Sequence, residues 1–77
     1  MKIYVSNLGF DVNDSALNDL FTAHGAVVSA KVILDRETGR SRGFGFVEMS
    51  DEESGKNAIR LLNNQDINGR PISVSIA

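Results

Sequence analysis

The chain has no cysteine, a single proline and no long hydrophobic run. Without cysteine it can form neither a disulfide nor a thiolate metal site, and it offers no cysteine nucleophile. No segment approaches the length of a membrane-spanning helix, and no signal-peptide pattern precedes the first strand-like residues. We therefore expect an intracellular, cytoplasmic protein with no membrane partner, no cofactor and no metal ion.

The length of 77 residues allows one domain with one modest core, and we expect residues 1–77 to form a single domain. Met1 stands directly before strand-like sequence, as in a complete small protein or a tightly cut domain. The hydrophobic fraction of 42% and the charged fraction of 23% are ordinary for a globular chain. The net charge of −2 is unfavourable for a nucleic-acid binder, because phosphates attract basic surfaces.

Alternation and helical spacing predict the first half of the chain. Residues 2–6 alternate between apolar and polar side chains, as a half-buried strand does. We expect a helix that begins after the N-cap Asn13, has Asp14 in its first turn and ends at Gly25 as a left-handed stop. The β-branched segment 27–34 predicts a second strand.

Residues 42–49 predict a third strand, and a second helix follows it. Ser50 with Glu53 three residues later forms a capping box with the serine as N-cap. A glycine inside a helix costs about 1 kcal/mol relative to alanine, so we expect a close helix–sheet approach at Gly55. The predicted buried face of this helix follows the i, i+3, i+4, i+7 spacing and consists of Gly55, Ala58, Ile59 and Leu62.

The turn signal Asn68-Gly69 precedes a last strand in which Ile72, Val74 and Ile76 are expected to point inward. The predicted order is therefore βαββαβ. Right-handed crossovers place the first and third strands side by side in the centre of the sheet. We expect an α+β, ferredoxin-like fold, in which two helices pack on one face of a four-stranded antiparallel sheet and leave the other face open.

The third strand carries two phenylalanines on one side. Side chains alternate along a strand, so Phe44 and Phe46 share a face with the charged Glu48, while Val47 and Met49 point inward. The charge indicates that this face meets water. Exposed aromatic rings two residues apart form an apolar patch, and such patches are typical of binding sites.

Two segments of the chain resemble paired motifs of the RNA recognition motif (RRM) family. Residues 3–8, Ile-Tyr-Val-Ser-Asn-Leu, resemble its hexamer, and residues 42–49 fit seven of the eight positions of its octamer. Met49 replaces the usual aromatic, but it is expected to face the core. The resemblance covers essentially the whole chain. The length of the chain resembles that of the stand-alone RRM proteins of bacteria.

The resemblance implies that the open face stacks two or three unpaired bases. Tyr4 and either Phe44 or Phe46 would stack successive bases, the remaining ring would lie against sugars, and Arg42 would pair with a phosphate. The implied partner is short single-stranded RNA, with single-stranded DNA bound more weakly, and the implied role is a monomeric, non-catalytic chaperone or regulator. Further open-face residues expected near base edges are Lys2, Lys31, Ile33, Glu48, Ser73 and Ser75.

Basic and acidic side chains are expected on different sides of the fold. Because the total charge is nevertheless negative, stacking should contribute more than phosphate contacts, with an affinity on the order of micromolar, about −8 kcal/mol. The basic residues near the sheet face are Lys2, Lys31, Arg36, Arg40, Arg42 and Arg70, and the acidic residues on the helices are Asp14, Asp19, Asp51, Glu52 and Glu53.

Two alternatives remain at this stage. The acidic balance also suits a protein–protein module in which a partner covers Phe44 and Phe46. A ferredoxin-like enzyme such as an acylphosphatase requires an anion-binding loop with an arginine after the first strand, and residues 7–11 contain none. The single histidine, His24, fits a helix boundary, and Asn7 fits a residue that fixes the loop backbone rather than one that reads a base. We expect no catalysis.

Overall fold

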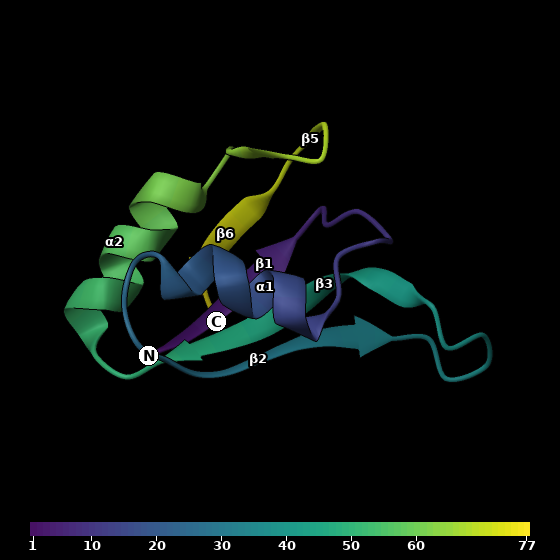
Figure 1. Ribbon diagram of the computed structural model, residues 1–77, viewed down its shortest axis with the longest axis horizontal. Helices are drawn as coiled ribbons and strands as arrows, with labels where there is room; N and C mark the ends of the chain where they lie inside the picture. The colour runs from purple at the N-terminus through teal and green to yellow at the C-terminus, as the bar shows by residue number, and fades with distance from the viewer.

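The computed structural model describes residues 1–77, and neither of its helices has the length and hydropathy to span a membrane. The predicted βαββαβ order is confirmed, with a short additional hairpin before the last strand (Figure 1). The first two strands have the predicted bounds. The elements are β1 (Lys2–Ser6), α1 (Asp14–Thr22), β2 (Val27–Leu34), β3 (Ser41–Met49), α2 (Glu52–Leu62), β4 (Asp66–Ile67), β5 (Arg70–Pro71) and β6 (Ser73–Ile76).

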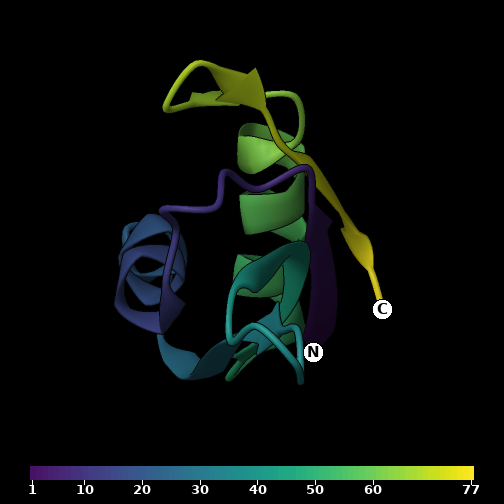
Figure 2. The ribbon, with the colours of Figure 1, turned by 90° about the vertical axis from the view of Figure 1, so that its right-hand side faces the viewer.

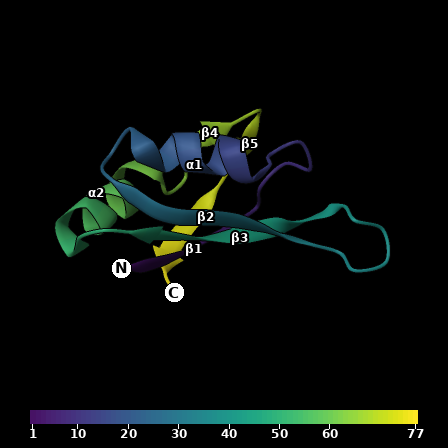
Figure 3. The ribbon, with the colours of Figure 1, turned by 60° about the horizontal axis from the view of Figure 1, so that its bottom comes forward.

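The four main strands form one antiparallel sheet in the order β2-β3-β1-β6, so β1 and β3 are central as predicted. Both helices lie on one side of this sheet, and the opposite side is uncovered (Figure 3). Seen from the side, β6 runs along the part of the molecule that faces away from α1 (Figure 2). The ferredoxin-like α+β fold expected from the sequence is thereby confirmed, and one face of the sheet is free for binding.

The hydrophobic core lies between the sheet and the helices. Ile3 and Val5 of β1 pack there with Leu17 and Phe21 of α1, and all four are 0% exposed. Because successive strand residues alternate, burial of these two β1 side chains sends Tyr4 to the open side of the sheet.

The boundaries of α1 follow the sequence at its start and differ at its end. Asn13 Oδ1 accepts a hydrogen bond from the Ala16 N–H at 2.8 Å, which confirms the predicted N-cap. The helix ends at Thr22 with Ala23 as C-cap in the right-handed region, so the prediction that Gly25 stops the helix was wrong by two residues. Gly25 has a φ of 153°, and a Cβ there would lie 2.6 Å from the Ser54 side chain, so close packing against α2 accounts for the glycine.

The predicted N-cap of α2 was also wrong by one residue. Asp51, not Ser50, caps the helix, and its side chain accepts a hydrogen bond from the Ser54 N–H at 3.0 Å. The Ser50 N–H donates to the Ala26 carbonyl at 3.0 Å, which ties this residue to the segment before β2 and leaves the cap to its neighbour. Glu53 therefore lies in the first turn, where an acidic side chain suits the helix dipole, rather than in a capping box.

The expected close approach at Gly55 is confirmed. A Cβ at this buried position would collide with the Sδ atom of Met1, which directly precedes β1. The Met1 ammonium donates to the Met49 carbonyl at 2.9 Å and so holds the start of the chain beneath α2.

The last strand confirms part of its predicted pattern. Ile72 and Val74 are buried, but Ile76 is 65% exposed, although its pairing with the buried Ile3 places it on the predicted side of the sheet. Ile76 pairs with Ile3 at the free end of an edge strand, where no further element packs on it. The predicted turn at Asn68-Gly69 is confirmed, since both residues have positive φ (53° and 84°) and join β4 to β5.

Each outer strand has one backbone N–H held by a side chain from the end of a helix. The Val32 N–H on β2 donates to Asp14 Oδ1 at 2.7 Å, and the Val74 N–H on β6 donates to Asn63 Oδ1 at 3.0 Å. Occupied edge groups are unavailable to a strand from another molecule.

Candidate functional site

Three aromatic rings lie together in the middle of the uncovered side of the sheet. Tyr4 on β1 is paired with Phe46 on β3, and Ser6 is paired with Phe44 in the same ladder. The ring centroids of Tyr4 and Phe46 are 5.5 Å apart, those of Tyr4 and Phe44 are 5.9 Å apart, and those of Phe44 and Phe46 are 6.4 Å apart. We call Tyr4, Phe44 and Phe46 the aromatic platform.

The rings of the aromatic platform contact one another in the tilted and edge-on arrangements that aromatic pairs prefer. Phe46 is 41% exposed, while Tyr4 and Phe44 are half-buried, although no helix covers this side. The rings thus support each other on rigid strands, and a flat ligand can stack on them with little ordering of side chains.

The glycines that alternate with the phenylalanines, Gly43 and Gly45, explain the close packing beneath the aromatic platform. Gly45 is buried on the helix side, and a Cβ there would lie 2.5 Å from the Lys31 carbonyl oxygen of β2. Gly43 has a φ of 84°, and its carbonyl accepts the Leu8 N–H at 2.9 Å. These contacts hold β3 between β1 and β2 while its phenylalanines face outward.

Arg42 lies at one end of the aromatic platform. Its Cζ atom is 5.8 Å from the centre of the Phe44 ring, which is a cation–π distance. The side chain is otherwise exposed, so a positive charge stands beside an aromatic face. This pairing suits a ligand that is both flat and anionic.

A shallow pocket of about 460 Å³ lies at the other end of the aromatic platform, beside Phe46. Lys31 pairs with Phe46 from β2, and Lys2 pairs with Glu48 from β1. The sequence-based prediction missed Ser29, which also lines this pocket and pairs with Glu48. Counting back two residues from Lys31 along the strand would have identified it. Two predicted residues that line the pocket beside these are Ile33 and Glu48.

The edge strand β6 adds two exposed hydroxyls. Ser75 pairs with Tyr4, and Ser73 pairs with Ser6, so both serines flank the first ring of the aromatic platform. The structure thus brings all ten predicted site residues to strands of one sheet, while their role in binding stays a prediction.

Asn7 and Arg70 fasten the loop after β1. The Asn7 Nδ2 donates to the Pro71 carbonyl at 2.7 Å, and its Oδ1 accepts from Arg70 Nη2 at 2.9 Å. Asn7 has a φ of 59°, a conformation that asparagine tolerates. The interpretation that Asn7 fixes the loop backbone is confirmed. The Arg70 guanidinium is held by its hydrogen bond to Asn7.

Asp35 orders the loop between β2 and β3. Its Oδ1 accepts hydrogen bonds from the Glu37 N–H at 2.8 Å and the Thr38 N–H at 3.2 Å. These bonds, with a smaller contribution from the charge of Arg42, lower the pKa of Asp35 below its ordinary value of 3.8. The loop therefore keeps a compact turn at neutral pH immediately before the strand that carries the phenylalanines.

Comparison with known proteins gives a consistent picture. The chain matches the family described as RNA recognition motif over residues 3–73. It is 54% identical over 76 residues to the 28 kDa ribonucleoprotein, chloroplastic, of Spinacia oleracea, a match that covers 99% of this chain and 33% of that protein. It is 50% identical over 76 residues to the Glycine-rich RNA-binding protein 4, mitochondrial, of Arabidopsis thaliana, covering 99% of this chain and 56% of that protein. The chain thus spans about a third to just over half of these relatives.

Solved structures resemble the fold closely. The crystal structure of RNA Binding Protein PG1 superimposes with a TM-score of 0.97 at 53% identity, covering 100% of this chain and 93% of that one. The structure of Rna15 RRM with bound RNA (GU) gives a TM-score of 0.89 at 30% identity, covering 99% of this chain and 81% of that one. The spinach and Arabidopsis relatives are named as chloroplastic and mitochondrial proteins. The expected likeness to bacterial proteins is therefore corrected to a likeness to the family as a whole.

Proposed function

Because the chain belongs to the RNA recognition motif family, we propose that it binds short single-stranded RNA on the open face of its sheet by stacking bases on the aromatic platform. The observation that carries this proposal is the cluster of three outward-facing rings with centroids 5.5 to 6.4 Å apart. Each base stacked on an aromatic side chain contributes roughly 1–3 kcal/mol. Two or three such stacks provide the binding free energy for an RNA complex without a strongly basic surface.

Single-stranded RNA fits this surface better than a duplex, because duplex bases are already stacked on one another. The bound strand crosses β1 and β3, with Arg42 meeting a phosphate beside Phe44 and with Lys31 beside Phe46. The exposed hydroxyls of Ser73 and Ser75 next to Tyr4 suit contacts to the 2′-OH, which DNA lacks, so single-stranded DNA binds more weakly.

The remaining open-face residues give a loose sequence preference. Side chains that touch base edges discriminate among bases by their donors and acceptors. In this domain they provide two ammonium groups, one carboxylate, one apolar side chain and two hydroxyls, which belong to Lys2, Lys31, Glu48, Ile33, Ser73 and Ser75.

The charge of the chain limits the affinity. With a net charge of −2, few counterions are released on binding, so the salt dependence is shallow and the Kd is on the order of micromolar. The RNA bound to the Rna15 RRM and the ribonucleoprotein name of the spinach relative support an RNA ligand.

The family is non-catalytic, which confirms that the chain is not an enzyme. We assign residues 1–77 to a single monomeric domain that acts as a chaperone or regulator of RNA. The occupied edge N–H groups of Val32 and Val74 support the monomer. An intracellular site of action follows from an RNA ligand, and the cytoplasm stays a prediction beside relatives named chloroplastic and mitochondrial.

Fluorescence anisotropy with labelled single-stranded RNA, single-stranded DNA and duplex RNA tests this function. The wild type should prefer single strands, and the double variant Phe44→Ala/Phe46→Ala should lose at least about tenfold in affinity while it stays folded by circular dichroism. Leu61→Ala is the matched control, because Leu61 is an exposed apolar residue (47%) on α2 and should leave binding unchanged. Equal binding by wild type and double variant would exclude stacking and favour the protein–protein module.

A further inference from the structure

Asn68 and Gly69 form the tip of the hairpin that joins β4 to β5, and both residues are exposed. A Cβ added at Gly69 would meet no atom within 4 Å, so the tip has open space around it. Figure 1 shows this hairpin standing out from the body of the molecule. The dipeptide has a chemistry of its own beyond the turn that it forms.

An asparagine followed by glycine is chemically labile, because asparagine is a thermolabile residue and glycine has no side chain to obstruct its backbone nitrogen. The Gly69 nitrogen loses its proton and attacks Asn68 Cγ. A new C–N bond closes a succinimide ring, and the side-chain nitrogen leaves as ammonia. Water then adds to one of the two ring carbonyls and cleaves its bond to the ring nitrogen. One water is consumed, one ammonia is released, and the product is aspartate or isoaspartate.

The hairpin is weak enough to allow this attack. Asn68 and Gly69 have left-handed backbone angles (φ 53° and 84°), and the turn has to open before the ring can close. β4 and β5 are joined by only two residue pairs, one of which contains Pro71, and proline has no N–H to donate. A two-stranded hairpin is marginally stable by itself. Local opening of this hairpin therefore costs less than unfolding of the domain.

One tertiary hydrogen bond restrains the reactive side chain. Asn68 Nδ2 donates to Asp11 Oδ2 at 3.2 Å, and Asp11 belongs to the loop after β1. The Val12 N–H donates to the Gly9 carbonyl at 3.1 Å, so a closed turn holds Asp11 in position. While this bond is made, the Asn68 amide is kept from turning toward the backbone nitrogen that would attack it.

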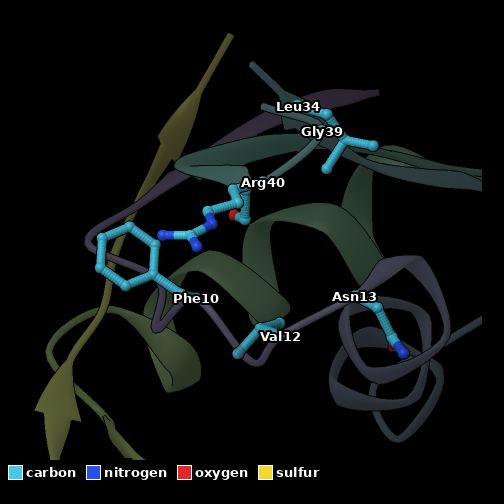
Figure 4. Close-up of a pocket in the computed structure, with 7 residues that line it drawn as sticks. Phe10, Val12, Asn13, Leu34, Gly39 and Arg40 are labelled. Atoms are coloured by element: carbon cyan, nitrogen blue, oxygen red, sulfur yellow. The ribbon is translucent and has the colours of Figure 1, made fainter. Parts of the chain in front are cut away.

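The same bond also helps to join the loop to the hairpin. Asn7 bonds to β5 at one end of the loop, and Asp11 bonds to Asn68 at the other. The loop also borders a pocket of about 490 Å³, in which Phe10 and Arg40 stand on facing walls (Figure 4). Because this pocket leaves open space beside the loop, polar bonds contribute to its position as well as packing.

Deamidation would turn the contact with Asp11 from a bond into a repulsion. The amide donates a hydrogen to Asp11, whereas a carboxylate at position 68 has none to donate and places a second negative charge at hydrogen-bond distance. Aspartate followed by glycine forms the same class of turn as Asn68-Gly69. The change would therefore be felt at the contact with the loop and not within the turn.

We propose that Asn68 is a site of spontaneous deamidation, and that the bond to Asp11 both slows the reaction and makes its product destabilising. The modification requires only water and goes beyond RNA binding. It is a one-way chemical change that loosens the β4–β5 hairpin from the loop after β1.

The rate is measured by peptide mass spectrometry during incubation in mildly alkaline buffer, where the attacking nitrogen loses its proton more readily. The acid should accumulate at Asn68 and not at Asn64, which is also exposed and left-handed (φ 67°) but is followed by Gln65. Asp11→Ala should raise the rate several-fold, up to about tenfold, the contribution of one hydrogen bond. Asp19→Ala is the matched control, since Asp19 lines a shallow pocket with Asn68 but is not its hydrogen-bond partner.

An intact Asn68 in the folded protein, under conditions in which the urea-unfolded chain is deamidated, would overturn the proposal. An equal rate at Asn64, or a wild-type rate in Asp11→Ala, would overturn it as well. Gly45→Ala separates local from global opening, because Gly45 lies in β3 and not in the hairpin. It should react at the wild-type rate, and an acceleration equal to that of Asp11→Ala would assign the reaction to global unfolding instead.

The consequence of the modification is tested with Asn68→Asp. Its thermal midpoint should fall by roughly 4–8 °C, the shift expected for one like-charge contact in a domain of this size. The double variant Asn68→Asp/Asp11→Asn exchanges donor and acceptor, so it should recover most of the loss. An unchanged midpoint in Asn68→Asp, or no recovery in the double variant, would show that the contact with Asp11 does not carry the effect.

Discussion

Tyr4 and Phe46 face each other across the β1–β3 ladder, with their ring centroids 5.5 Å apart and their planes tilted by 54°. One ring comes from the first strand of the chain and the other from the third. Their contact exists only when the central pair of strands has formed in register. Stacking capacity is therefore a property of the assembled sheet, and each ring holds the other in place for a ligand.

Two substitutions of Tyr4 distinguish the contribution of its ring to RNA binding from that of its hydroxyl. Tyr4→Phe should bind single-stranded RNA within about twofold of the wild type, while Tyr4→Ala should lose roughly tenfold, because a stack on an aromatic side chain contributes roughly 1–3 kcal/mol. Fluorescence anisotropy at one fixed salt concentration measures both. A loss of similar size in Tyr4→Phe would assign the contribution to the hydroxyl and contradict stacking at this position.

Removal of the negative charge at Glu48 should strengthen binding. Glu48 lies on the open face beside Lys2, and a single charge a few ångström from a phosphate contributes about 1 kcal/mol in water. We expect Glu48→Gln to lower the Kd a few-fold at low salt and to approach the wild type at high salt, because salt screens the charge.

The matched control is Glu53→Gln, which removes the same charge from the first turn of α2. It should leave the Kd nearly unchanged at every salt concentration. Weaker binding by Glu48→Gln would instead indicate that the carboxylate accepts a hydrogen bond from a base.

Alanine should affect the buried glycines Gly45 and Gly55 differently. At Gly45 the added Cβ would meet the Lys31 carbonyl oxygen at 2.5 Å, and this backbone cannot move without separating β2 from β3. Gly45→Ala should therefore lower the free energy of unfolding by about 1–3 kcal/mol. Urea denaturation measures the change.

Gly55→Ala should be milder, because the colliding group is the flexible Met1 side chain and alanine gains about 1 kcal/mol of helix propensity. If both variants lost the same stability, the distinction between backbone and side-chain obstruction would be wrong.

Asp51→Ala should destabilise the domain more than Ser50→Ala, because Asp51 caps α2. The hydrogen bonds from Ser54 lower the pKa of Asp51 below its ordinary value of 3.8. A carboxyl with a lowered pKa stabilises the folded state above its ordinary value, and this stabilisation is lost as the pH falls through the folded-state pKa. The difference in urea midpoint between wild type and Asp51→Ala should therefore shrink below pH 3.8. A constant difference across this range would contradict a charged cap.

Local sequence patterns predicted the elements well where one interaction dominates. The strict alternation of residues 2–6 gave the bounds of β1, and Asn13 marked the start of α1. Neighbouring groups that compete for one role were harder to predict. Ser50 and Asp51 are both good N-caps, and the choice between them depends on the bond of the Ser50 N–H to Ala26, which belongs to a distant segment.

The sequence by itself determined which side chains face the open side of the sheet. Strand periodicity is a local property of the backbone, so Tyr4, Phe44 and Phe46 could be assigned to one face before the fold was known. Tertiary structure alone decided the distances between the three rings and the exposure of Ile76 at the end of β6. It also decided that Phe10, from the loop after β1, lines one pocket with Leu34 at the end of β2 and Arg40 of the following loop, because only packing of the whole chain brings these segments together.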